Sequence, residues 1–142
     1  STINFGTVRR NTDNNYSYKG NQLAVRQQNI SISCDPQPDD ASPYTVSLRF
    51  SGDISDVYKS GFAIRGALRT SISDLFILPT STQLSDDRIP INGDAVPLKL
   101  DPTTQRYNLL VDWALMGFSP NGQAPAEYGN FSAIATYTVE VN

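Results

Sequence analysis

The side chains that carry most enzyme chemistry are scarce in this sequence. Its 142 residues include no histidine and one cysteine, Cys34. Histidine is the commonest general base and metal ligand, and without it no nearby base of that kind activates the many Ser and Thr hydroxyls. A single cysteine also excludes a thiolate metal cluster and a disulfide within the chain. The sequence therefore predicts that the chain is not an enzyme and holds no metal and no cofactor.

Two pairs of adjacent aspartates and one tryptophan are the remaining candidates for a chemical site. Asp39-Asp40 and Asp86-Asp87 lie among prolines and other turn-forming residues, where solvated carboxylates are the ordinary outcome. Trp113 could serve as a platform for a sugar ring, but its place in an alternating stretch favours a core position. We therefore expect the function to lie in surfaces and edges.

Charge and hydropathy exclude two further classes of partner. The formal charge is −3 and no block of Lys or Arg occurs, which argues against nucleic-acid binding. No apolar run reaches the roughly 18 residues of a membrane-spanning helix, so we expect no membrane insertion. Turn-forming residues are frequent, and no stretch keeps helical periodicity, which is typical of an all-β domain.

Three stretches show the period-two alternation that indicates a β-strand with one buried face. They are residues 44–50, residues 107–115 and the final stretch, residues 129–142. In the final stretch the apolar side of the alternation consists of Phe131, Ala133, Ala135, Tyr137, Val139 and Val141. We predict that this strand begins at Gly129, lies in a sheet and buries those six side chains.

Weaker patterns predict the other strands. Residues 2–8 place Ile3 and Phe5 on one face of a first strand. Residues 23–34 change parity near Gln27-Gln28, which predicts a β-bulge or two short strands there. The apolar run from residue 75 to 78 fits a strand covered on both faces, and Asn92-Gly93 predicts a hairpin tip. Seven or eight strands in one domain indicate a Greek-key β-sandwich.

Four of these stretches, taken in order, resemble the subunits of bacterial chaperone–usher pili of the type 1 and P pilus kind. They are INFGTV (3–8), NISISC (29–34), YTVSLRF (44–50) and GNFSAIATYTV (129–139). Gly129 stands where these subunits carry a glycine, and the nearest likeness is to minor tip-fibrillum or adaptor pilins. Val141 departs from the pattern, because an aromatic residue is usual at that place.

The resemblance implies an incomplete immunoglobulin-like Greek-key β-sandwich that is completed by a donor strand. A periplasmic chaperone would lend this strand to the groove between the first and last strands, and a neighbouring subunit would later replace it. The residues implied to line the groove are Ile3, Phe5, Phe131, Ala133, Ala135, Tyr137, Val139 and Val141. The chaperone would hold the terminal carboxylate of Asn142, and an outer-membrane usher and neighbouring pilus subunits would be the other partners. The implied location is a fimbrium at the bacterial surface, reached through the periplasm.

The resemblance also bears on Cys34. On its own this residue, at the end of a predicted strand, reads as a buried thiol. In the family the matching cysteine forms a disulfide with an earlier cysteine, which here would precede Ser1 together with an N-terminal donor-strand extension. Residues 1–142 would then be a single pilin domain, either of a longer subunit or following another domain in a two-domain tip adhesin.

Two functions compete on this basis. The first is a structural subunit of a pilus, assembled by exchange of donor strands. The alternative is the pilin or receptor-binding domain of a tip adhesin that binds host carbohydrate. That function would need exposed aromatic side chains or a polar pocket on loops, and the only hints of these are Tyr16, Tyr18 and Tyr58. A glycan array separates the two, because a purely structural subunit should bind no sugar.

Overall fold

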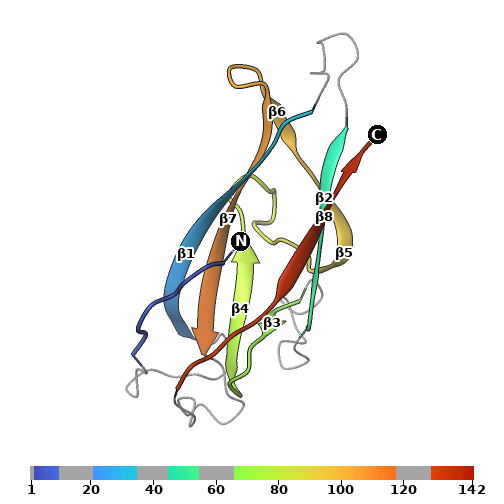
Figure 1. Ribbon diagram of the computed structural model, residues 1–142. Coiled ribbons are helices and arrows are strands. Elements are labelled where there is room, and N and C mark those ends of the chain that lie inside the picture. Colours follow the sequence, from blue (N-terminus) through green and yellow to red (C-terminus); the bar gives the residue numbers. More distant parts are fainter. Residues whose placement is uncertain (1, 10–20, 35–44, 55–65, 118–128) are drawn as a thin grey trace.

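The computed structural model describes residues 2–9, 21–34, 45–54, 66–117 and 129–142. These residues form eight β-strands in two sheets (Figure 1). The strands are β1 (Asn21–Ile32), β2 (Val46–Gly52), β3 (Leu68–Arg69), β4 (Leu75–Thr80), β5 (Asn92–Pro97), β6 (Lys99–Asp101), β7 (Arg106–Gly117) and β8 (Ala135–Val141). The described part of the chain contains no helix that is long and apolar enough to cross a membrane.

The larger sheet is built around β7. β1 pairs antiparallel with one edge of β7, β4 and β6 share the other edge, and β3 pairs with β4. The alternation predicted for β7 is confirmed, because its odd-numbered residues face the core. Tyr107, Leu109, Val111, Trp113 and Leu115 are each 8% exposed or less.

The smaller sheet has three strands in the order β5-β2-β8. Its central strand, β2, buries Val46, Leu48 and Phe50 almost completely. The two sheets pack face to face, and the rings of Phe50 and Trp113 meet edge to face with centroids 6.5 Å apart. The main core of the domain lies between them.

The run from Leu75 to Leu78 is covered on both faces, as predicted. Leu75 and Ile77 belong to the main core. Phe76 and Leu78 belong to a second, smaller cluster of buried side chains that includes Ala67 and Ala114. All four residues of the run are less than 8% exposed.

The predicted β-bulge and the predicted hairpin tip both differ from expectation. The register shift of β1 falls between Gln22 and Ala24 and not at Gln27-Gln28, so that Leu23 and Ala24 both pack on the main core. Asn92-Gly93 is not a hairpin tip but the beginning of β5, where the pairing with β2 shifts register. There the Asn92 Oδ1 accepts a hydrogen bond from the Asp94 backbone N–H (3.1 Å) and Gly93 adopts φ +94°. The local hydrogen bond bends the chain within the strand and does not reverse it.

Candidate functional site

A groove of about 790 Å³ opens between the two terminal segments of the chain. In Figure 1 the amino-terminal segment crosses β1, and the segment that leads into β8 crosses β4. Residues of these two segments form the walls: Thr2, Ile3, Phe5, Phe131, Ser132, Ala133, Ile134, Ala135, Thr136 and Tyr137. Core-facing side chains of both sheets form the floor: Gln28, Phe50, Leu68, Ile77 and Trp113. The groove therefore reaches into the space between the sheets.

The first wall, residues 2–9, is not the strand that its alternation predicted. The Asn4 Oδ1 accepts a hydrogen bond from the Gly6 backbone N–H (2.7 Å), and Gly6 adopts φ +65°, so the segment turns locally. Its carbonyl groups are bound by a side chain of β1, since Arg26 donates to Asn4 O (3.2 Å) and to Phe5 O (2.8 Å). Side-chain bonds thus take the place of a backbone ladder.

The second wall begins with residues 129–134, which also differ from the prediction because the strand starts only at Ala135. Gly129 adopts φ +112°, a conformation that glycine takes far more readily than other residues. The Ser132 N–H donates to Ser71 Oγ, and the Ser71 N–H donates to Ser132 O, both at 2.9 Å. The segment is thereby bound to the turn between β3 and β4, and pairing with β2 begins where Ala135 meets Gly52.

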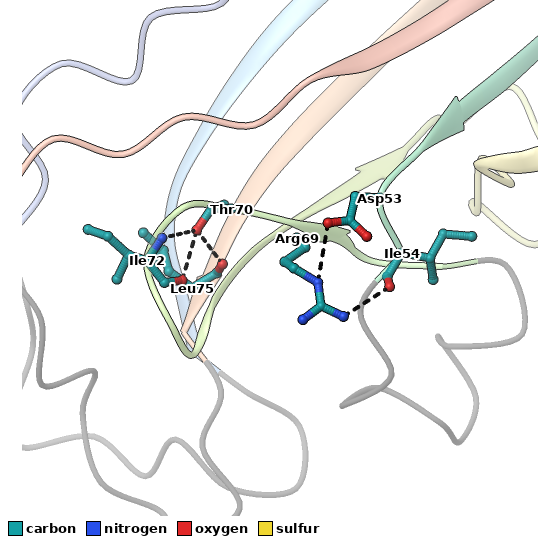
Figure 2. A network of polar contacts seen from close by, with 6 residues as sticks. All are labelled: Asp53, Ile54, Arg69, Thr70, Ile72 and Leu75. Atoms are coloured by element: carbon teal, nitrogen blue, oxygen red, sulfur yellow. Dashed lines mark hydrogen bonds and ion pairs between the residues drawn. The ribbon is translucent and has the colours of Figure 1, made fainter.

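That turn is itself held by a small polar network (Figure 2). The buried Thr70 Oγ1 is bonded to the carbonyl groups of Ile72 (3.0 Å) and Leu75 (2.6 Å) and accepts from the Ile72 N–H (3.2 Å). On the preceding side of the turn, Arg69 forms an ion pair with Asp53 (3.4 Å). Ser71 is therefore presented to Ser132 by a locally constrained backbone.

The core-facing residues of β8 are half exposed. Tyr137, Val139 and Val141 are 42%, 43% and 48% exposed, whereas their partners Phe50, Leu48 and Val46 on β2 are at most 1% exposed. The expectation that all six apolar residues of the final stretch are buried is therefore wrong, since these three are exposed and Phe131, Ala133 and Ala135 are only partly buried. The reason is their place at a sheet edge, because β8 pairs with β2 alone among the described strands.

The backbone of β8 is also open toward the groove. Thr45 and Asn142 exchange both of their backbone hydrogen bonds (2.8 and 2.9 Å). Because bonded and non-bonded pairs alternate along an antiparallel ladder, the register directs the N–H and C=O groups of every second residue away from β2. Those residues are Ala135, Tyr137, Val139 and Val141. The same residues thus present both side chains and backbone groups to the open edge.

An ion pair on the opposite face fixes β8 against its neighbour. Arg49 Nε lies 2.9 Å from Glu140 Oε2, and Arg49 Nη1 also donates to the Gly93 carbonyl of β5 (2.8 Å). Hydrogen bonds from Arg49 and then from Asn142 lower the pKa of Glu140 below its ordinary value. The hydrogen bond to Glu140 raises the pKa of Arg49 in return. The central strand thereby holds both edge strands of its sheet.

Six of the eight residues predicted to line a donor-strand groove lie on the observed groove: Ile3, Phe5, Phe131, Ala133, Ala135 and Tyr137. Val139 and Val141 continue the same face of β8 beyond it. Asn142 is bonded to Thr45 through its backbone and to Glu140 through its side chain (3.1 Å). The partners assigned to all these residues stay predictions.

Other candidate residues turn out differently. Cys34 follows the end of β1 and is a free, partly buried thiol, so the expectation of full burial is wrong. Trp113 is a core residue, as expected, and donates through Nε1 to Gln28 Oε1 (3.0 Å). Asp86 and Asp87 lie in the turn region between β4 and β5. Asp39, Asp40, Tyr16, Tyr18 and Tyr58 lie outside the described residues.

The floor of the groove was not predicted. The floor residues carry no feature in the sequence that marks a groove: Gln28, Phe50, Leu68, Ile77 and Trp113. A period-two pattern indicates which side chains face the core but not where the core is left uncovered. Only the arrangement of the strands could identify them.

Solved structures of chaperone–usher pilus proteins share this fold. The chain is similar to a chain from the structure of a chaperone–usher pilus (TM-score 0.65, 22% identity, covering 100% of this chain and 82% of that one). It is similar to the P pilus rod subunit PapA (TM-score 0.61, 19% identity, covering 100% and 92%). It is also similar to the CupB6 tip adhesin from Pseudomonas aeruginosa (TM-score 0.61, 14% identity), where the match covers 84% of this chain and 31% of the adhesin.

These similarities are structural and not close in sequence. No protein-family model matches the chain, and no curated protein matches it. The expected resemblance to chaperone–usher pilus proteins is therefore confirmed at the level of the fold. The expected all-β, immunoglobulin-like architecture is confirmed with it.

Proposed function

We propose that this chain is a structural subunit, or a domain of one, in a bacterial chaperone–usher pilus, and that its groove accepts a β-strand from a partner protein. The observation that carries the proposal is the open edge of β8. The side chains of Tyr137, Val139 and Val141 are half exposed there, and the backbone N–H and C=O groups of the same three residues point away from β2. One added strand would supply hydrogen-bond partners for these backbone groups and would cover the exposed side chains. Its backbone hydrogen bonds would give affinity, and its alternate side chains would fill the groove.

The energy available from such a strand is large. Each apolar side chain that a donor buries contributes about 1.5–3 kcal/mol, so four or five of them contribute on the order of 10 kcal/mol before ordering costs. The net stability of a whole domain is typically about 5–15 kcal/mol. The partner strand would thus affect stability as strongly as the rest of the fold.

The fold similarity supports the identity of the partners. Three pilus proteins share the architecture, and two of them are covered over most of their length. We infer that the donor is first a periplasmic chaperone and then a neighbouring pilus subunit, with an outer-membrane usher as the assembly platform. On this proposal residues 1–142 are a single pilin domain of a surface fimbrium, and the chaperone holds the carboxylate of Asn142.

The test is titration with a synthetic peptide, long enough to span β8, in which Val alternates with Thr. Trp113 is the sole tryptophan and lines the groove floor, so its fluorescence reports occupancy directly. We expect saturable binding, and none for a control peptide of the same composition with the Val residues grouped together. Equal binding of both peptides, or of neither, would refute the proposal.

A second prediction concerns Cys34. We expect the native secreted protein to join this thiol in a disulfide to a cysteine that precedes Ser1, because oxidising compartments favour such bonds. Mass spectrometry of the non-reduced, full-length protein measures the pairing. A free Cys34 in a protein that does carry an upstream cysteine would count against the pilus assignment.

A tip-adhesin origin is the second candidate. It is favoured by the match to the CupB6 tip adhesin, of which this chain covers 31%. On this alternative the chain is the pilin or receptor-binding domain of a longer protein that binds host carbohydrate. Screening the chain on a glycan array distinguishes the two, since specific sugar binding by residues 1–142 would favour the adhesin.

A further inference from the structure

Arg26 makes an unusual set of contacts at the edge of the larger sheet. It lies on β1 opposite Trp113, next to the groove. All three nitrogens of its guanidinium donate to backbone carbonyl groups: Nε to Asn4 O (3.2 Å), Nη2 to Phe5 O (2.8 Å) and Nη1 to Val25 O (2.8 Å). One side chain thus connects β1 to the first wall of the groove at two successive residues.

The same guanidinium also contacts an aromatic ring of the wall. Its central carbon lies 5.9 Å from the centroid of the Phe5 ring, within the range of a cation–π interaction. Phe5 is 7% exposed, and its ring lies 6.2 Å from the ring of Phe131 on the opposite wall. A continuous series of contacts therefore runs from Arg26 through Phe5 to Phe131.

The first wall depends on this residue because it lacks strand pairing. Residues 2–9 form no β-strand, and the Asn4–Gly6 turn directs the backbone away from a ladder with β1. Hydrogen bonds from a charged donor are roughly twice as strong as neutral ones, so the two bonds from Arg26 to Asn4 and Phe5 can hold the segment. Lysine cannot reproduce them, because its ammonium group is a single point and not a planar fork.

We propose that Arg26 is a positioning residue of the groove, which holds the residue 2–9 wall against β1 and so sets the position of Phe5 and the width available to an incoming strand. The inference rests on the proposed strand-accepting function, and it attributes the position of the first wall to a single side chain, that of Arg26. It also predicts that β8, on the other wall, does not depend on Arg26.

The experiment compares Arg26→Gln and Arg26→Lys with the matched control Arg106→Gln. Arg106 also reaches β1 through its guanidinium, which bonds the side chain and carbonyl of Ser31, but these bonds join β7 to β1 and do not reach a wall of the groove. Hydrogen exchange followed by mass spectrometry measures the amides of residues 2–9, with β7 as an internal reference. Fluorescence titration of Trp113 measures the affinity for the alternating Val/Thr peptide.

We expect Arg26→Gln to accelerate exchange in residues 2–9 by about tenfold or more and to weaken peptide binding by about tenfold, as the loss of charged hydrogen bonds implies. Arg26→Lys should fall between Arg26→Gln and the wild type, and Arg106→Gln should match the wild type in both measurements. Exchange in β7 should not change in any variant, which shows that the domain stays folded.

Unchanged exchange in residues 2–9 of Arg26→Gln would overturn the inference. Faster exchange with unaltered peptide affinity would overturn it as well, because Arg26 would then stabilise the segment without shaping the groove. Failure of the wild-type chain to bind the peptide would reject the proposed function, and the role of Arg26 in strand capture with it. That failure is recognisable because the exchange measurement needs no peptide.

Discussion

The two edges of the three-stranded sheet, β5 and β8, are built in opposite ways. β5 begins with a bend at Gly93, exposes Asp94 and ends in Pro97. A bend, a charge and a proline are the devices by which proteins prevent an edge strand from pairing with another chain. β8 is a regular strand of seven residues, ATYTVEV, whose one charged residue, Glu140, is paired with Arg49 across to β2.

Burial follows the same division. Val96 of β5 is 2% exposed, whereas Val139 of β8, which flanks the other side of Leu48 on β2, is 43% exposed. The protein therefore protects one edge and leaves the other open along a groove that reaches its core. The contrast within one sheet indicates that the open edge is a specific feature and not a consequence of a small sheet.

The largest expected effect is on the stability of the whole domain. Without a donor, we expect the chain to aggregate or to form strand-swapped oligomers through β8. Saturating alternating Val/Thr peptide should raise the melting temperature by about 10 °C, by mass action on the folded state. Size-exclusion chromatography and thermal melting measure both effects. A monomer that melts cooperatively at an ordinary temperature, unaffected by any peptide, would show that the sandwich is already complete.

The next largest effect is on peptide affinity, when a larger side chain is introduced at the β8 edge or, as a control, at the β5 edge. Ala133 and Ala135 leave space in the groove, so Ala135→Phe or Ala133→Phe should reduce peptide affinity by about 100-fold through overlap with the donor side chains. The matched control is Ala95→Phe, because Ala95 is an exposed alanine on β5. Unchanged affinity in Ala135→Phe would mean that the groove is assigned wrongly.

A smaller effect tests the backbone register of β8. The N–H of Val139 points away from β2, and that of Thr138 points toward it. Val139→Pro should therefore weaken peptide binding by about tenfold while the β2–β8 pairing survives. Thr138→Pro should instead lower the melting temperature of the peptide complex, because it removes a native ladder bond. The reverse pattern would show that the inferred register is wrong.

The smallest effect is expected from the ion pair that holds β8 to β2. Because the pKa of Glu140 is lowered in the folded state, its contribution is present above the unfolded pKa and is lost as pH falls through the folded pKa. Wild type and Glu140→Gln should thus differ in melting temperature at neutral pH and converge in acid. The difference should shrink in high salt, since the pair is exposed. A difference that grows as the pH falls would contradict the assignment.

The sequence was sufficient to predict the buried side chains of strands that have a neighbouring strand on both edges. β7 shows this clearly, since Tyr107, Val111 and Leu115 alternate and are all buried. In β8 the same period-two pattern was equally regular, yet Val139 and Val141 are half exposed. Alternation records which face a strand offers to a core, and it does not record whether that core is complete.

The two walls of the groove show a second limit. Ile3 and Phe5 were assigned to the groove from the family resemblance, but their segment is held by Arg26 and not by a ladder. Likewise, Ser71 and Ser132 lie far apart in the sequence, and no sequence pattern predicts the hydrogen bonds between them. Such contacts between side chains and backbone depend on the tertiary arrangement, and local periodicity carries no signal for them.

The Ser71–Ser132 bridge has a mechanical consequence. β8 is bonded laterally to β2 of the smaller sheet, and just before β8 the chain is bonded to the β3–β4 turn of the larger one. A tensile load applied to β8 by a strand seated in the groove would reach the larger sheet through Ser71 as well as the smaller sheet through β2. Both sheets would then share the load, and the larger sheet would resist it while β8 is still paired with β2.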